Sequence, residues 1–195
     1  MASSRQPPLI LASASPRRAE LLSSAGFEFL VDAADVDESE RPGEGPQEYV
    51  LRVAQAKART VAARCRKSGS VVLAADTTVV IDGEILAKPA GDSDAVRMLK
   101  RLAGAVHDVF TGVVAVAGDR ELAEVVRTRV HLLPLTIDDI KWYVETGEPI
   151  RFQGMFHPVG SDLTMAEAKR SKINAFGIQY EGKTGLSKSE FSWAA

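Results

Sequence analysis

An eleven-residue apolar run in the first half of the chain sets the frame for the fold. Residues 71–81 read Val-Val-Leu-Ala-Ala-Asp-Thr-Thr-Val-Val-Ile, so they are rich in β-branched side chains and contain one charged residue, Asp76. A run of this kind is typical of a strand that is covered on both faces. Because an unpaired carboxylate is costly to bury, Asp76 requires a cation, a proton or a metal ion beside it. The run therefore predicts a central strand with a charged group in its middle.

Periodicity and turn residues on either side of this run predict an α/β protein with a mixed sheet. Apolar or β-branched segments predict further strands at 9–12, 27–31, 84–87, 108–117 and 124–133. Apolar spacing and capping residues predict helices at 16–26, 47–66, 93–102 and 136–146. Asp82-Gly83 predicts a hairpin turn between the central strand and the strand that follows it. Strands and helices alternate at first and a hairpin follows, which favours a mixed over a strictly parallel sheet.

The composition excludes several classes of protein. The 195 residues include 24 Lys and Arg against 26 Asp and Glu, a net charge of −2, so the chain lacks the basic footprint of a nucleic-acid-binding protein. No apolar run approaches the ~18 residues of a membrane span, and we find no signal-peptide pattern. The single cysteine, Cys65, cannot form an intrachain disulfide, which is typical of a reducing compartment. We therefore expect one cytoplasmic domain over 1–195, without a nucleic-acid or membrane partner.

The first candidate site is the helix start Ser13-Ala14-Ser15-Pro16-Arg17-Arg18. Ser15 suits the N-cap and Pro16 the first helical position. The free N–H groups and the dipole of a helix start favour an anion, whereas two arginines there cost about 0.3–1 kcal/mol each unless an anion compensates. The planar fork of arginine suits phosphate. Two interpretations stand equally at this point, a phosphate site and an ordinary surface helix start.

The second candidate is Asp76 together with an acidic stretch farther upstream. Asp35, Asp37 and Glu38 could supply a second carboxylate to a hard divalent ion such as Mg²⁺ or Mn²⁺. The competing interpretations are an Asp76 that pairs with a nearby lysine or arginine, and an acidic stretch that is a solvated face. Residue types alone do not decide between them.

The third candidate is a pair of lysines in apolar surroundings. Lys57 lies on the inward stripe of its predicted helix, and Lys88 stands between Ala87 and Pro89. Each could be a side chain whose ammonium reaches water. Together with two arginines and an acidic site, however, they suit a polyphosphate pocket, and a metal with basic anchors favours hydrolysis or transfer at phosphate. His107 is interpreted as structural.

Several motifs occur in a characteristic order along the chain. They are Ser13 to Leu22, Ala54 to Ala58, Ala75 to Val79, Leu86 to Pro89, Met98 to Gly104, His107 to Gly112, Thr128 to Val130, Ile140 to Tyr143, and Gly147 to Pro149. In this order and spacing, the chain resembles the Maf family of nucleoside triphosphate pyrophosphatases from Leu9 through Pro149. The resemblance implies a mixed α/β sheet that forms two lobes around a central cleft, commonly in a homodimer.

The resemblance also implies an activity, a metal and a set of site residues. The family cleaves a nucleoside triphosphate between the α and β phosphates, releasing the monophosphate and pyrophosphate with a divalent cation, Mg²⁺ or Mn²⁺. Carried over, the catalytic groups are Asp76, Lys57 and Lys88, with Asp76 acting as a base or a metal anchor. The metal ligands are Glu38 and Asp76. The substrate-binding residues are Ser13, Arg17, Arg18, Thr77 and Gln179.

Thr77 directly after Asp76 resembles the family branch that acts on dTTP and UTP. The C-terminal segment, 150–195, departs from the family pattern, since 25 residues separate Pro149 from the Ala-Phe-Gly-Ile-Gln stretch that ends at Gln179. If that segment is replaced, Gln179 loses its base-reading role. Two alternatives stay open: a nucleotide-binding regulatory protein with little turnover, linked to arrest of cell division, and a pyrophosphatase selective for another or a modified nucleotide.

Overall fold

The computed structural model describes residues 7–65, 69–132, 134–145 and 179–181. For residues 179–181 it describes the backbone only. In chain order the elements are β1 (Leu9–Leu11), α1 (Pro16–Ser24), β2 (Phe29–Val31), α2 (Pro46–Cys65), β3 (Val71–Ile81), β4 (Glu84–Leu86), α3 (Asp92–Leu102), β5 (Val106–Ala117), β6 (Arg120–His131), α4 (Ile137–Glu145) and β7 (Gln179–Glu181). Segment 150–195, apart from β7, lies outside the described residues. None of the described helices is long and apolar enough to cross a membrane.

The strands form one mixed sheet in the order β2-β1-β3-β5-β6-β7, with β4 also paired to β3. β1 runs parallel to both β2 and β3, whereas the pairs β3–β5, β5–β6, β6–β7 and β3–β4 are antiparallel. The predicted mixed α/β sheet is therefore confirmed, and the apolar run of residues 71–81 is its central strand.

The central strand β3 has one continuous edge and one interrupted edge. β5 pairs with residues 71–80 of β3 and occupies the first edge. On the other edge β1 pairs with residues 71–73 and β4 with residues 79–81. Among the described strands, none pairs with residues 74–78 on this second edge. Asp76 and Thr77 therefore lie on a stretch of β3 whose second edge, here called the open edge, has no partner among the described strands.

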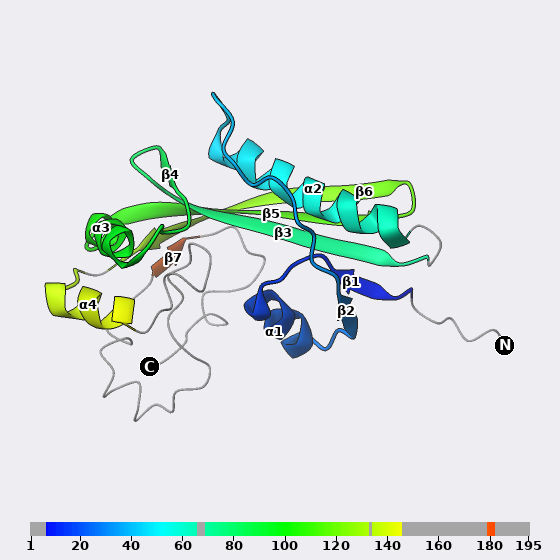
Figure 1. Ribbon diagram of the computed structural model, residues 1–195, viewed down its shortest axis with the longest axis horizontal. Coiled ribbons are helices and arrows are strands. Elements are labelled where there is room, and N and C mark those ends of the chain that lie inside the picture. The colour runs from blue at the N-terminus through cyan, green and yellow to red at the C-terminus, as the bar shows by residue number, and fades with distance from the viewer. Residues whose placement is uncertain (1–6, 66–68, 133, 146–178, 182–195) are drawn as a thin grey trace.

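Two hydrophobic clusters flank this opening and give the fold its two lobes. The first joins Val72 and Ala74 of β3 to β1 and to Ala54 and Ala58 of α2. The second joins the other end of β3, through Val79, to α3 and β4. Figure 1 shows α2 along one face of the long strands, with α3 and α4 gathered toward one end and β1, β2 and α1 toward the other. The opening of β3 lies between the lobes.

The second strand of the β5–β6 hairpin begins earlier than the sequence predicts. β5 extends to Ala117 and β6 starts at Arg120, so the turn is Gly118-Asp119, with Gly118 at a φ of 58°. The strand predicted at 124–133 is confirmed as β6, but it starts at Arg120, because residues 120–124 are polar or exposed on both faces and give no alternating signal. By contrast, the turn predicted at Asp82-Gly83 is confirmed, with φ values of 52° and 79°.

Candidate active site

Helix α2 brings a lysine onto the central strand because it packs close to the sheet. Ala54 and Ala58 on α2 are fully buried against β3, and these small side chains allow close approach. Gly112 on β5 has the same effect, since a Cβ there would lie 2.7 Å from the carbonyl oxygen of Val50. Lys57 lies on the same buried stripe of α2 and is only 6% exposed. Its ammonium is therefore held at the sheet surface.

The ammonium of Lys57 joins two carboxylates. Its Nζ lies 2.8 Å from Oδ1 of Asp76, which is 5% exposed, and 2.8 Å from Oε1 of Glu38, whose side chain is 30% exposed. The two carboxylate oxygens are thus no farther apart than twice that distance. Of the acids considered in the upstream stretch, Glu38 is the one that pairs with Lys57. The structure thus gives Asp76 a cation, as one of the alternative interpretations required.

Burial makes the carboxyl of Asp76 a stronger base than an exposed aspartate. Desolvation raises the pKa of Asp76 above its ordinary value of 3.8, and the nearby charge of Glu38 acts in the same direction. The ammonium of Lys57 and the guanidinium of Arg18 oppose this rise. A carboxylate with a raised pKa next to an anion-binding cation is typical of a general base in a phosphate-handling site.

A second polar cluster lies on the opposite face of β3, around Arg18 of α1. Arg18 donates from Nη1 to Oγ of Ser13 at 3.0 Å and from Nη2 to Oγ1 of Thr77 at 3.4 Å. Oγ1 of Thr77 lies 3.1 Å from Oγ1 of Thr111 on β5. The analysis of the sequence did not single out Thr111 as a site residue; the signal it offered was a polar side chain inside the motif from His107 to Gly112.

The two clusters are electrostatically coupled around the open edge of β3. Successive residues of a strand project to opposite faces, so Asp76 faces α2 while Thr77 faces α1. Burial lowers the pKa of the Arg18 guanidinium, and the charges of Asp76 and Glu38 act to raise it. Arg18 therefore lies within the field of both carboxylates, and one polyanion at the open edge can reach cations from both faces.

The first turn of α1 differs in detail from the prediction. Ser15 occupies the N-cap position, but its side chain makes no capping hydrogen bond. Instead, its backbone N–H donates to Oγ of Ser13 at 3.2 Å. Because Ser13 also accepts from Arg18, this buried hydroxyl ties the loop after β1 to the arginine. Ser13 thus lies in the same cluster as Arg18, and its substrate-binding role stays a prediction.

The family model described as Maf-like protein matches residues 8–180. The chain belongs to the Maf family. Its relatives include two proteins named dTTP/UTP pyrophosphatase. The one from Symbiobacterium thermophilum is 49% identical to this chain over 76% of this chain and 75% of its own length. The one from Myxococcus xanthus is 45% identical over 87% of this chain and 86% of its own length. A solved structure, the Ham1 protein of Staphylococcus aureus, is 14% identical over 65% of this chain and 71% of its own, with a TM-score of 0.42.

Two of the predicted site residues, Arg17 and Lys88, form no hydrogen bond or ion pair with the clusters within the described part of the chain. Arg17 is half-buried and Lys88 is exposed. Lys88 follows the end of β4 by two residues, and β4 runs toward the open part of β3. Gln179 begins β7, where its backbone lies opposite His131; its side chain is outside the described part. The roles given to these residues stay predictions.

A divalent metal ion, as expected of a Maf protein, would need oxygen or nitrogen donors in this site. The described residues contain no group of three or more His, Cys, Asp or Glu that could hold a metal ion. Mg²⁺, however, is commonly held by one or two carboxylates together with substrate phosphates and water. Asp76 and Glu38 already converge on one cationic group, the ammonium of Lys57. This pair of carboxylates fits a divalent ion that binds together with a nucleotide.

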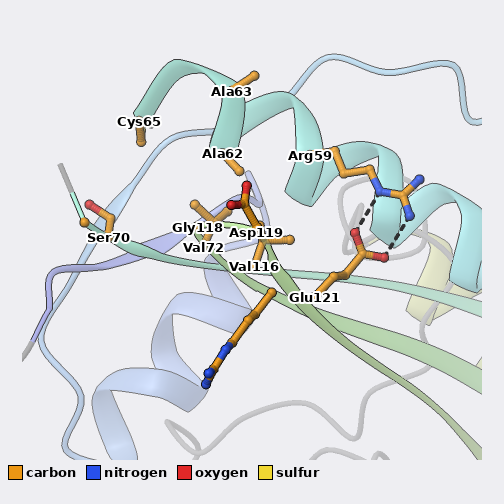
Figure 2. A pocket seen from close by; sticks show the side chains of 12 residues that line it. Arg59, Ala62, Ala63, Cys65, Ser70, Val72, Val116, Gly118, Asp119 and Glu121 are labelled. Carbon is orange, nitrogen blue, oxygen red and sulfur yellow. Dashed lines mark hydrogen bonds and ion pairs between the residues drawn. The ribbon is translucent and has the colours of Figure 1, made fainter. Parts of the chain in front are cut away.

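A pocket of about 390 Å³ lies apart from the candidate active site, at the end of the sheet where β3 begins and β5 turns into β6 (Figure 2). It lies between the C-terminal part of α2 and the β5–β6 turn, and its lining includes Cys65 and Ser70. Arg59 and Glu121 form a paired ionic contact beside it, with two N–O distances of 2.8 Å. None of the predicted site residues lines this pocket, so it is separate from the candidate active site.

Proposed function

We propose that this chain is a nucleoside triphosphate pyrophosphatase that hydrolyses dTTP and UTP to the monophosphate and pyrophosphate. The observation that carries the proposal is the junction of Lys57 with both Asp76 and Glu38, beside the cluster of Arg18. A buried carboxylate beside two cations supports the assignment of Asp76 as the base. The relatives named dTTP/UTP pyrophosphatase support the choice of substrates.

The cations bind and orient the triphosphate in this proposal. Arg18 approaches from α1 and Lys57 from α2, so the phosphate chain lies across the open edge of β3 between them. Arg17 and Lys88 have no partner among the described residues and would add contacts to the outer phosphates. Charge-assisted hydrogen bonds to phosphate are about twice as strong as neutral ones. Binding by several such groups fixes the α-phosphate relative to Asp76.

Asp76 acts as the base in the hydrolytic step. It accepts a proton from a water molecule whose oxygen forms a bond to the α-phosphorus, while the bond from that phosphorus to the α–β bridging oxygen breaks. Pyrophosphate leaves with the bridging oxygen, and Arg18 and Lys57 stabilise the charge that develops on it. Asp76 and Glu38 would also hold a divalent metal ion, Mg²⁺ or Mn²⁺, which when bound supplies neutralisation of phosphate charge.

Selectivity, assembly and location belong to the same proposal and rest on the family. Thr77, which contacts Arg18, is the residue proposed to mark dTTP and UTP as substrates, with Gln179 reading the base. A homodimer in the cytoplasm is proposed on the same ground, and the single cysteine is compatible with that compartment.

The experiment is a measurement of pyrophosphate release from a panel of nucleoside triphosphates with Mg²⁺ or Mn²⁺. The wild-type chain and the Asp76→Asn variant are assayed side by side, and binding of a non-hydrolysable dTTP analogue is followed by thermal shift. Release from dTTP and UTP that is lost in the variant supports the proposal. Binding of the analogue by a wild-type chain that releases no pyrophosphate from any nucleotide favours the regulatory alternative. Release confined to other nucleotides contradicts the assigned substrates.

A further inference from the structure

The segment that carries Glu38 lies outside the helices and strands, yet α2 holds its backbone at three consecutive carbonyl groups. Tyr49 donates its hydroxyl hydrogen to the carbonyl oxygen of Glu38 at 2.9 Å. Arg52 donates from Nη2 to the carbonyl oxygen of Ser39 at 2.9 Å and from Nη1 to that of Asp37 at 3.5 Å. The position of Glu38 is therefore set by side chains of the same helix that carries Lys57.

The two donors are themselves held in place. Arg52 forms a paired contact with Glu44, including Nη2 to Oε2 at 2.7 Å. Its guanidinium carbon lies 5.6 Å from the centre of the Tyr49 ring, in cation–π contact. Burial and the nearby charges of Asp76 and Glu38 raise the pKa of Tyr49 to about 12. The phenol therefore stays protonated and remains a donor across the pH range in which proteins work.

The spacing along α2 explains why these contacts matter for the site. Tyr49 and Arg52 are three residues apart, so they are neighbours on the helix surface, and Lys57 follows Tyr49 by about two turns. One rigid helix thus contacts the backbone on both sides of Glu38 and, through Lys57, the Glu38 carboxylate itself. The backbone contacts therefore act together with the ion pair between Glu38 and Lys57 in ordering this irregular segment.

We propose that Tyr49 and Arg52 are positioning residues that hold the backbone of residues 37–39 so that the Glu38 carboxylate meets Lys57 and Asp76. This inference rests on the proposed function, since Glu38 is assigned there to the active site. In this proposal Tyr49 and Arg52 act through Glu38, by way of their contacts with the backbone of residues 37–39.

The first test is a double-mutant analysis with Glu38. Tyr49→Phe removes the phenolic donor, and Arg52→Lys keeps the charge but removes the fork that spans two carbonyls. We expect each to lower kcat/KM for dTTP by about three- to tenfold, the equivalent of one or two hydrogen bonds. In a Glu38→Gln background the same substitutions should cost less than about twofold, since residues that act through one group are not additive. An equal loss in both backgrounds overturns the proposal.

Arg59→Lys is the matched control. Arg59 lies farther along α2 and forms a comparable paired contact with a glutamate, Glu121, but none with residues 37–39. We expect this variant to leave kcat/KM unchanged in both backgrounds. A loss equal to that of Arg52→Lys would mean that any weakening of α2 reduces activity, and it would contradict a specific role for Arg52.

The second test follows the backbone and does not depend on turnover. Amide hydrogen exchange over residues 35–41 should become about fivefold or more faster in Tyr49→Phe and Arg52→Lys, while exchange over β3 and in Arg59→Lys stays at the wild-type rate. Unchanged exchange over residues 35–41 in both variants overturns the inference even if the enzyme is active. Conversely, a wild-type chain that releases no pyrophosphate contradicts the proposed function. The exchange result still decides whether Tyr49 and Arg52 hold the backbone of residues 37–39.

Discussion

Lys57 of α2 and Asp76 of β3 form a 2.8 Å ion pair in which both residues are buried, although 19 positions separate them in the sequence. The pair exists because α2, which carries small side chains where it packs on the sheet, lies close to the face of β3. Burial makes the ionised carboxylate costly, and the ammonium offsets part of that cost. The charge state of the candidate active site therefore depends on how α2 docks on the sheet.

Asp76→Asn is expected to lower pyrophosphate release by about 10²- to 10⁴-fold, the usual contribution of a general base. Its melting temperature should change little, because the buried ammonium of Lys57 keeps its ion pair with Glu38 and the substitution removes a carboxylate whose ionisation burial disfavours. The measurements are steady-state kinetics and a thermal melt. Asp108→Asn is the control, since Asp108 lies on the neighbouring strand β5 and pairs with Arg127 near the surface. Near-wild-type activity in Asp76→Asn would remove Asp76 from the mechanism.

Lys57→Met is expected to destabilise the protein at neutral pH by about 3 kcal/mol, because it leaves Asp76 buried without its nearest cation. The folded-state pKa of Asp76 already lies above the ordinary 3.8, and loss of Lys57 raises it further. Stability contributed by such a group is present below the unfolded pKa and is lost as pH rises through the folded pKa.

The difference between Lys57→Met and wild type should therefore be larger at pH 7 than at pH 5. Urea unfolding at the two pH values measures it. An equal difference at both would mean that Lys57 stabilises the fold by packing of its aliphatic stem and not through its charge.

Arg18→Ala is expected to raise the KM for dTTP by at least about tenfold, since a charge-assisted hydrogen bond contributes about 1.5–3 kcal/mol. Arg18→Lys should recover only part of the loss, because an ammonium lacks the fork that holds Ser13 and Thr77 together. Arg127→Ala, which removes an exposed arginine paired with Asp108, should leave KM unchanged. Wild-type kcat and KM in Arg18→Ala would contradict the assignment of Arg18 to phosphate.

Gly112→Ala is expected to lower both stability and turnover. The new Cβ would lie 2.7 Å from the carbonyl oxygen and 2.8 Å from the carbonyl carbon of Val50, so α2 would have to move away from β5. Overpacking of this kind costs about 1–3 kcal/mol, and the movement would displace Lys57 from Asp76. Chemical unfolding and kcat measure the two effects.

The control for this variant is Gly91→Ala, since a Cβ at Gly91 would meet open space. Its cost should stay within about 1 kcal/mol, the usual effect at a helix N-cap, and kcat should be unchanged. A Gly112→Ala variant with wild-type stability would mean that α2 can shift without penalty, and the close docking of α2 would then not set the site.

Much of the secondary structure could be predicted because its signals are local. The boundaries of β3 agree with the apolar run at 71–81, and the Asp82-Gly83 turn was found from two residues. Local signals failed where pairing decides the outcome. The polar start of β6 joins a strand only because β5 lies beside it, with Ala117 opposite Arg120.

The candidate site could be predicted in part for the same reason. Lys57 and Asp76 stand out as charged residues in apolar surroundings, and Arg18 as a cation at a helix start. Thr111 and Tyr49, by contrast, carry no such mark. Their importance comes from what they touch, namely Thr77 and the backbone of Glu38, and those contacts join segments that are distant in the sequence or lack regular structure.

By itself the sequence determined the order of the elements, the central strand and the charged residues that a folded chain would have to compensate. It did so because side-chain periodicity and the cost of burying charge act residue by residue. Only the tertiary structure decided which cation meets Asp76 and that Glu38 shares it. That outcome depends on the distance between α2 and β3. The small side chains of Ala54 and Ala58, and the absence of a side chain at Gly112, let α2 lie close enough to the sheet for Lys57 to form its ion pair with Asp76.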